Sequence, residues 1–242
     1  MKKSDLAEIF LRSLSIQSSW GFQGMQNVGF AYSLIPLVRS GRNKKWISGI
    51  LTRYMRPFSS HPYLTGAIIA SVVRVEEESD GSPDCPEGVR LEEALMAPYA
   101  AIGDPFFWGG LRPFSSVAAV LLALGGLVIA PIVFLLVYNS IHLWIRLKGF
   151  VEGYRDGKGG IDFLGRMALP QKTLVLKWGT TFFLALLGAV FVGSSFPPVD
   201  LGWGFTLGGT LALVLLCIWL VSRGISSLAV LYGAALFFVV IV

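Results

Sequence analysis

The chain has 242 residues, of which 54% are hydrophobic and only 14% are charged, and its formal net charge is +5. A soluble domain usually carries about 25% charged residues, so this composition indicates a membrane protein. The positive charge does not predict nucleic-acid binding, because the basic residues flank apolar segments, as in membrane-orientation signals. The two cysteines, Cys85 and Cys217, lie far apart in the sequence and predict neither a disulfide framework nor a metal site.

The first residues predict an amphipathic helix and no cleavable signal peptide. Charges are spread through the start of the chain, and no continuous apolar run follows them. Between residues 4 and 15, apolar side chains recur at helical spacing opposite Asp5, Glu8 and Arg12, and Ser4 is the expected N-cap. Such a helix would lie on a membrane surface or on a partner protein.

Three apolar pieces follow in the first half of the chain, at residues 25–38, 61–75 and 94–113. Each is short for a transmembrane helix, so we expect half-helices or surface helices, and the number of membrane crossings stays open. Between the second and third pieces, residues 76–88 predict an acidic loop that is rich in turn residues.

The third piece contains charged residues and prolines in apolar surroundings. Asp104 followed by Pro105 predicts the N-cap and first residue of a helix, and Arg112 before a proline predicts its end. We therefore expect two short helices joined by a turn at residues 103–104. A broken segment survives in a bilayer only where it is buried in protein or lines a wet cavity, as at the substrate sites of transporters. Asp104 would then be either a helix cap or part of a substrate site.

Composition divides the chain into two halves, 1–115 and 116–242, and long apolar runs dominate the second half. A helix break is expected in the first run, at Gly125-Gly126 or at Pro131. The predicted membrane spans of this half are residues 116–145, 178–194, 205–221 and 227–242.

Lysine and arginine residues set the expected orientation of this half. Residues 146–177 are rich in both and are predicted to form a cytoplasmic loop. Residues 195–204 contain neither and should face outward.

Five short motifs occur along the chain: QSSWGFQGMQNVGFAYSLIP at 17–36, HPYL at 61–64, EEE at 76–78, IGDPFFWGGLRP at 102–113 and YN at 138–139. In this order they resemble the IID component of mannose-type (mannose/fructose/sorbose) sugar phosphotransferase permeases. The pattern GDPxFWGxLRP after QSSW is highly specific. The resemblance covers residues 10–175 well and the C-terminal spans loosely.

The resemblance implies an all-α polytopic membrane protein with amphipathic surface helices and broken or re-entrant half-helices. It implies a multi-pass protein of the bacterial inner membrane, with a cytoplasmic N-terminus, in a trimer of IIC–IID pairs surrounded by membrane lipid. The soluble IIA and IIB phosphocarrier proteins would phosphorylate a hexose or amino sugar as it enters. We expect no phosphorylation of this chain, no catalysis by this chain alone, no cofactor, no metal and no nucleic acid.

A sugar site needs an aromatic face for the ring and planar polar groups for adjacent hydroxyls. The expected substrate-binding residues are Trp20, Gln26, Asn27, His61, Asp104 and Arg112. Two of them have an alternative role, because Trp20 could anchor the chain at the membrane interface and His61 could bond only a backbone carbonyl.

A second group of polar and aromatic residues is expected to have structural or interface roles. Asn139, His142 and Arg146 share one helical face within an apolar span and should point into the helix bundle. A carboxylate near the sugar could act as general base, or the base could belong to the IIC subunit. The residues of this group are Gln17, Glu76, Glu77, Trp108, Asn139 and Arg146.

The sequence departs from the family pattern after QSSW, where an Asn-aromatic-Glu-Arg-Met sequence is usual. Gly21, Gln23 and Gly24 replace the amide, the carboxylate and the guanidinium, and His142 stands where the family has arginine. These changes leave the sugar open and motivate an alternative, a non-transporting regulatory or binding subunit of a phosphotransferase complex. A further alternative is an unrelated secondary transporter, which predicts uptake independent of phosphoenolpyruvate.

Overall fold

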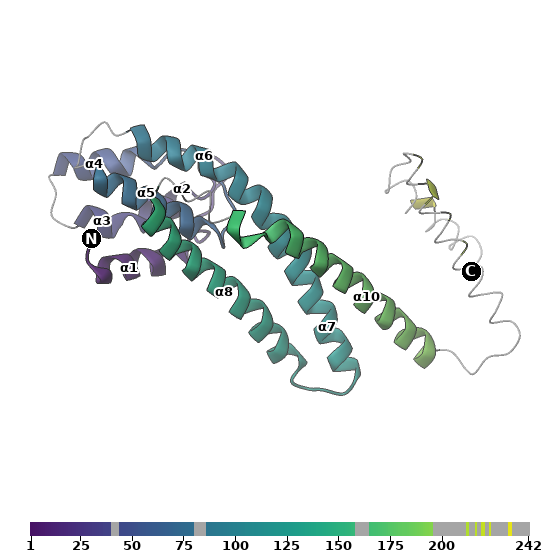
Figure 1. Cartoon of the computed structure of the whole chain (residues 1–242). Helices are drawn as coiled ribbons and strands as arrows, with labels where there is room; N and C mark the ends of the chain where they lie inside the picture. Colours follow the sequence, from purple (N-terminus) through teal and green to yellow (C-terminus); the bar gives the residue numbers. More distant parts are fainter. Residues whose placement is uncertain are drawn as a thin grey trace, which may run out of the picture. The chain divides into compact units, whose positions relative to one another are not determined.

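The computed structural model describes residues 1–39, 44–79, 86–157 and 165–195, with isolated positions between 212 and 233. The backbone forms two compact units, Met1–Gly188 and Ala189–Val242. The described residues form helices and two isolated β-bridges but no strand, so the predicted all-α fold is confirmed (Figure 1). The spans predicted at 205–221 and 227–242 and the outward loop after residue 195 lie largely outside the described residues.

The chain begins with a surface helix and three short helices. These are α1 (Lys3–Ser13), α2 (Asn27–Ser33), α3 (Ile35–Arg39) and α4 (Lys44–Arg53). Helix α1 is amphipathic as predicted, since Ile9 is buried and Leu6 and Phe10 pack on the core, whereas Lys3 and Ser4 are exposed. The N-cap prediction for Ser4 is wrong, because the helix already begins at Lys3 after an extended Lys2, and no side chain caps it.

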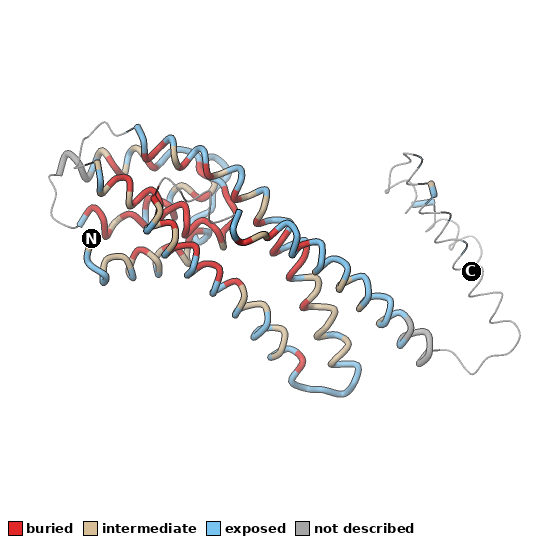
Figure 2. The backbone as a smooth tube through the Cα atoms, viewed as in Figure 1, coloured by how far each residue is buried: buried red, intermediate tan, exposed pale blue. Residues whose placement is uncertain are grey.

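Helix α5 (Thr65–Glu78) is the centre of the core. Every residue from 65 to 76 except Arg74 is buried, as expected for a helix that is apolar on nearly all sides (Figure 2). It packs mainly on α8 (Ala130–Asp156) and α6 (Pro86–Gly103). Because α5 continues to Glu78, the acidic loop predicted from residue 76 begins later, and residues 80–85 lie outside the described part.

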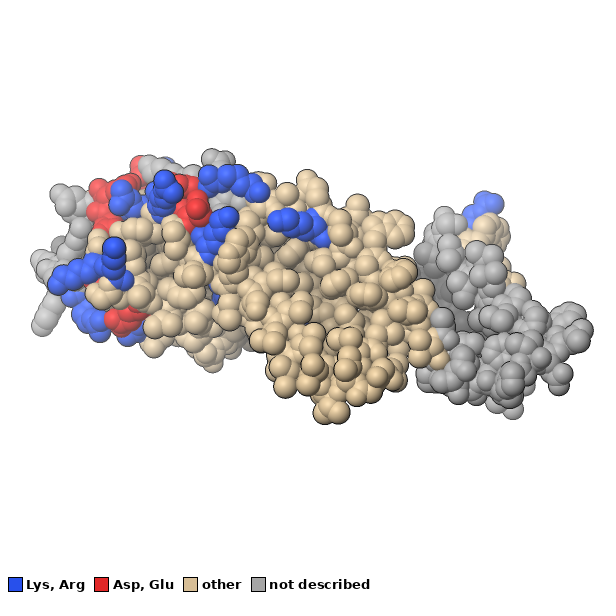
Figure 3. Space-filling view, turned by 60° about the horizontal axis from the view of Figure 1, so that its bottom comes forward, with Lys and Arg blue, Asp and Glu red and all other residues tan. Residues whose placement is uncertain are grey.

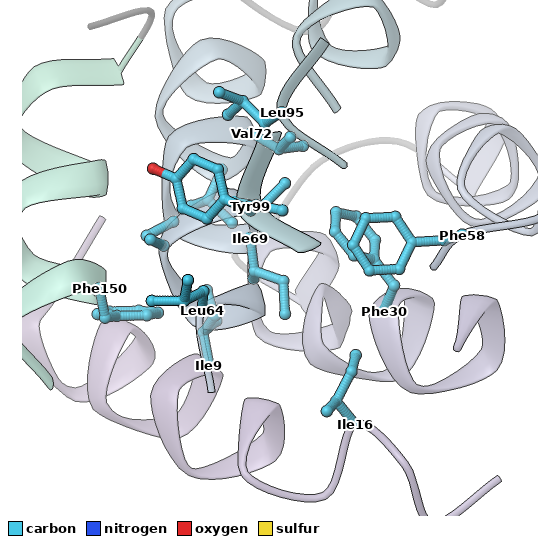
Figure 4. Close-up of a cluster of buried hydrophobic side chains, with 14 of the residues drawn as sticks. Ile9, Ile16, Phe30, Phe58, Leu64, Ile69, Val72, Leu95, Tyr99 and Phe150 are labelled. Carbon is cyan, nitrogen blue, oxygen red and sulfur yellow. The ribbon is translucent and has the colours of Figure 1, made fainter. Parts of the chain in front are cut away.

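Aromatic side chains from outside the long helices complete this core. The rings of Phe30 and Phe58 lie 4.5 Å apart between centroids, and Ile16 lies beside this pair (Figure 4). Phe150 of α8 meets Phe10 of α1 edge-on at 5.4 Å. The N-terminal helices are therefore packed into one core with α5 and α8.

The turn predicted at residues 103–104 is wrong. Helix α6 continues directly into the π-helix η1 (Asp104–Leu111) and then into α7 (Arg112–Leu124). Gly103 has helical angles of φ −68° and ψ −48°, so Asp104 caps nothing, and Arg112 is helical as well. The wider π turn shifts the backbone hydrogen-bond register where Pro105 and Pro113 lack N–H groups, so the helix continues through both.

The break predicted at Gly125-Gly126 is confirmed. Helix α7 ends with Gly125 as its C-cap, and Gly126 has a φ of +84°, which favours glycine. The following α8 extends to Asp156, and α10 (Leu169–Ser195) begins well before residue 177. The cytoplasmic loop predicted at 146–177 is therefore too long, since both of its ends are helical. The compositional boundary at 115–116 falls inside α7.

Two continuous helical stretches, Pro86–Leu124 and Ala130–Asp156, are long and apolar enough to cross a membrane. In each stretch, only 22% of the most apolar segment of 18 residues is buried inside the protein. Charged side chains gather toward the end of the first unit that carries α3 and α4, whereas the surface over the far ends of α7 and α8 lacks them (Figure 3). Exposed apolar surface of this extent indicates contact with lipid or with another membrane protein.

Candidate functional site

His61 is the centre of the candidate site. It lies just before α5, and its side chain is fully buried, with its ring stacked on Phe107 of η1 at 4.8 Å and 17°. The Nδ1 atom accepts the backbone N–H of Tyr63 at 3.3 Å, which places the proton on Nε2. In the described part of the chain this Nε2–H has no hydrogen-bond partner, and the Oδ1 atom of Asp104 lies 3.9 Å away.

The protonation state of His61 follows from its surroundings. Burial and the positive charge of Arg146 lower the pKa of His61 to about 3. The ring is therefore neutral at physiological pH and can donate one hydrogen bond from Nε2. A hydroxyl group between Nε2 and the Asp104 carboxylate would satisfy both.

The π-helix brings a carboxylate and an indole next to His61. Asp104 is 53% exposed in its side chain, Trp108 is 45% exposed, and the Trp108 ring lies 5.0 Å from that of His61. Gly103 permits this approach, because a Cβ there would lie 2.4 Å from the His61 Cβ. A donor, an acceptor and a partly exposed aromatic face are groups that recognise a polyhydroxylated ligand.

Side chains of α8 hold the segment that carries His61. Arg146 of this helix is buried, and Nη2 donates to the carbonyls of Ser13 and Pro62, both at 3.2 Å. His142 stacks on Tyr63 at 4.4 Å and lies 3.0 Å from Oδ1 of Asn139 through Nε2. The face predicted to point into the bundle does so, and it joins α1 and the His61 segment to α8.

Two residues adjoining this support had not been selected from the sequence. The hydroxyl of Tyr138 donates to that of Tyr63 at 3.2 Å, and the predicted site residue Arg112 is exposed. Tyr63 lies within the HPYL motif and Tyr138 within YN, so the motifs contained the signal, but their pairing spans 75 positions.

Gln26 and Asn27 hold backbone segments in place. The Gln26 amide is buried, with Nε2 donating to the Ser60 carbonyl at 2.9 Å and Oε1 accepting the Ser60 N–H at 3.2 Å. Asn27 donates from Nδ2 to the Met55 carbonyl at 2.7 Å. Gln26 therefore fixes the segment that leads to His61.

Gln17 and Trp20 lie on the surface, between α1 and α2. Gln17 is exposed and Trp20 is 55% exposed. Within the described residues no hydrogen bond or ring contact joins either to His61. The structure thus brings His61, Asp104 and Trp108 together and leaves Trp20 apart from them.

The carboxylates of Glu76 and Glu77 lie far along α5. Glu76 is fully buried, and its Oε1 accepts the Tyr54 hydroxyl at 2.5 Å and Nη1 of Arg53 at 3.3 Å. Glu77 accepts from the N-terminal amine and from the Tyr154 hydroxyl. Both follow the start of α5 by about 16 Å of helix, so neither can act as a base beside His61. Among the described residues no group of three or more His, Cys, Asp or Glu side chains could hold a metal ion.

Comparison with known proteins assigns the chain to a family. The family model described as PTS system mannose/fructose/sorbose family IID component matches residues 1–202. The chain is 29% identical to the mannose-specific EIID component of Escherichia coli over 177 residues, which are 72% of this chain and 62% of that relative. It is also 29% identical to the sorbose-specific EIID component of Klebsiella pneumoniae, with 94% of this chain and 86% of the relative covered.

The fold is similar to those of two solved membrane proteins. One is a chain of the mannose transporter ManYZ in complex with a microcin, with a TM-score of 0.62 and 24% identity over 99% of this chain and 96% of that chain. A second membrane protein gives a TM-score of 0.75, with the same identity and coverage. The match to the Escherichia coli relative spans less than two thirds of that relative, whereas the family model covers most of this chain. The chain therefore belongs to the mannose/fructose/sorbose family of phosphotransferase-system IID components, which are membrane proteins.

Proposed function

We propose that this chain is the IID subunit of a mannose-type sugar phosphotransferase permease. The observation that carries the proposal is the family match over residues 1–202, which includes every motif around His61 and Asp104. The subunit would pair with a IIC membrane subunit, as a trimer of pairs, and serve IIA and IIB phosphocarriers. The cargo would be a hexose or an amino sugar.

The proposed location is the bacterial inner membrane, with several crossings and a cytoplasmic N-terminus. Two continuous apolar stretches, Pro86–Leu124 and Ala130–Asp156, support the crossings. The basic residues of the described part between 146 and 177 support a cytoplasmic face at that end of α8 and α10.

The phosphoryl group is proposed to pass to the sugar from the partners and not through this chain. The chain has only two histidines, His61 and His142, and both are buried. His61 also has a pKa of about 3 and is enclosed by aromatic rings. A phosphocarrier protein needs an accessible histidine, so neither residue suits that role.

His61, Asp104 and Trp108 are proposed as this chain's contribution to the sugar site, with Arg112 at its edge. The exposed Asp104 carboxylate would accept a hydrogen bond from a sugar hydroxyl, and the buried His61, whose Nε2 lies 3.9 Å from Oδ1 of Asp104, would form the wall behind that carboxylate. The exposed part of Trp108 offers an apolar face for the C–H side of the ring. Trp20, on its exposed loop, would contact sugar only if the IIC subunit brings the sugar there.

Phosphoenolpyruvate-dependent sugar phosphorylation tests the function. Membranes that contain this chain and its IIC partner would receive the soluble phosphotransferase proteins and a panel of hexoses and amino sugars. We expect phosphorylation of at least one sugar that disappears when the chain is absent. No phosphorylation of any sugar by an assembled IIC–IID pair would refute the proposal.

Two sets of variants refine this test. Asp104→Asn should lower phosphorylation at least tenfold while the pair still assembles, whereas Asp5→Asn on α1 should not. Restoring the family's asparagine, glutamate and arginine at positions 21, 23 and 24 addresses the regulatory alternative. If uptake appears only in the restored chain, the native chain is a non-transporting subunit.

A further inference from the structure

A groove unrelated to the proposed sugar site lies between α8, α10 and η1. Its volume is about 610 Å³, and its lining is apolar apart from Ser140 and Lys172. Trp144 forms part of the α8 wall, and Val175 part of the α10 wall. His61, Asp104 and Trp108 do not line it, so it is a separate feature of the surface.

Two lysines at this groove have no acidic partner among the described residues. Lys172 lines the groove and is exposed. Lys148 follows the groove residue Trp144 by one helical turn, with its ammonium 4.9 Å from the centre of the Trp144 ring. The nearby carboxylates of α8, Glu152 and Asp156, both pair with Arg166. Within the described ranges, Lys172 in the lining and Lys148 beside Trp144 therefore give this side of the groove a positive charge that no acidic side chain balances.

The groove lies where apolar helices become charged. Helix α8 contains no Lys, Arg, Asp or Glu from residue 130 to 145 and is rich in them from 146 onward. Helix α10 has the reverse order, with Lys172 and Lys177 near its start and no charge after them to residue 195. A tryptophan and lysines at such a boundary are typical of the headgroup level of a membrane.

We propose that this groove binds an anionic phospholipid of the surrounding membrane. The phosphate would lie between Lys172 and Lys148, and an acyl chain would lie along the apolar wall formed by α8 and α10. Charge complementarity favours this occupant, because an anionic headgroup neutralises two lysines that have no acidic partner in the part of the chain that the structure describes. An apolar protein helix in the groove would bury them without a counter-charge.

Native mass spectrometry of the delipidated full chain in detergent tests the proposal. Phosphatidylglycerol and phosphatidylcholine with identical acyl chains would be titrated, together with soluble glycerol phosphate. We expect phosphatidylglycerol to bind more tightly than phosphatidylcholine, and glycerol phosphate not to compete. Equal binding of both lipids, or full competition by glycerol phosphate, would overturn the proposal, since either shows that headgroup charge and acyl chain do not act together.

Substitution of the lysines locates the site. Lys172→Gln should weaken phosphatidylglycerol binding about fivefold, and the double variant with Lys148→Gln about 25-fold. Lys177→Gln is the matched control, because Lys177 is an exposed lysine of the same helix that does not line the groove. An equal loss in the control would mean that overall charge, and not this groove, attracts the lipid.

A photoreactive amino acid at position 175 identifies the occupant in intact membranes. Val175 lines the groove and is exposed, so its replacement should leave the fold unchanged. We expect an adduct with the mass of a phospholipid. A polypeptide adduct would overturn the proposal and identify the groove as a protein interface.

Discussion

Arg146 is predicted to stabilise the fold by joining three parts of the chain. Its Nη2 atom donates to the carbonyls of Ser13, at the end of α1, and of Pro62, before α5, both at 3.2 Å. A hydrogen bond from a charged donor contributes about 1.5–3 kcal/mol. The two bonds together contribute about 3–6 kcal/mol, and part of their loss is offset because a methionine does not have to bury a charge.

We therefore expect Arg146→Met to lower the free energy of unfolding by about 3–5 kcal/mol. For a chain of this size that corresponds to a fall in melting temperature of roughly 6–20 °C. Arg146→Lys should lose about half as much, because an ammonium keeps the charge but reaches fewer carbonyls. The seven tryptophans allow melting to be followed by intrinsic fluorescence in detergent.

Arg155 provides the matched control for Arg146. It is an exposed arginine of the same helix and has no ion pair among the described residues. Arg155→Met should leave the melting temperature nearly unchanged. If Arg146→Met melts within about 2 °C of the native chain, or if both variants lose the same amount, Arg146 does not join these segments.

Three further predictions concern the surroundings of His61. Gly103→Ala should lower sugar phosphorylation and cost about 1–3 kcal/mol, because the added methyl would lie 2.4 Å from the His61 Cβ, whereas Gly109→Ala, with nothing closer than 3.9 Å, should be tolerated in the same assays. Gln26→Ala should cost about 1–3 kcal/mol in thermal melts through two lost backbone bonds, and Gln23→Ala on the surface should cost almost nothing. The pKa of the His61 side chain is about 3 in the folded chain and about 6.5 in the unfolded chain, so the unfolded chain takes up the proton first as the pH falls. The free energy of unfolding should therefore decrease below pH 6.5, by at most about 1.4 kcal/mol per pH unit. A stability–pH slope that is unchanged in His61→Phe would contradict this last expectation.

Structural features that depend only on residues close together in the sequence could be predicted. The amphipathic α1 follows from helical spacing, and the end of α7 follows from Gly125 and the positive φ of Gly126. The family was recognised because its motifs are local strings of residues. The match to the family over residues 1–202 confirms that recognition.

The π-helix could not be predicted in this way. An Asp-Pro pair starts many helices, so the local pattern at Asp104 favours a cap. A bilayer, however, offers no water to the free backbone groups of a helix end, and this favours a continuous helix. Gly103 also packs directly on His61, which is 42 positions away in the sequence, and a local pattern contains no information about that contact.

The partners of the polar residues were also beyond the sequence. Gln26 carries the donor and acceptor groups that a sugar site needs, but its amide is used by Ser60, 34 positions away. Glu76 carries a carboxylate suited to a general base, but it accepts a bond from Tyr54 at a distant part of α5. Residue type indicated the chemistry that each side chain could perform, and only the packing decided which partner it has.

The loop after Trp20 shows how one departure from the family pattern affects another residue. Gly21 and Met25 exchange two backbone hydrogen bonds, at 3.1 and 2.7 Å, and Met25 has a φ of +53°. A Cβ at Gly24 would lie 2.4 Å from the side chain of Asn27, which donates to the Met55 carbonyl. The family's arginine at position 24 therefore requires Asn27 to leave Met55.

Position 21 is different, because a side chain there meets nothing within 4 Å. Gly21→Asn with Gln23→Glu thus changes only the chemistry of the exposed loop, whereas Gly24→Arg also changes its support through Asn27. If the double variant alone raises sugar phosphorylation, the family's side chains act by direct contact with sugar or partner. If position 24 is needed as well, the shape of the loop around Asn27 is what this chain has altered.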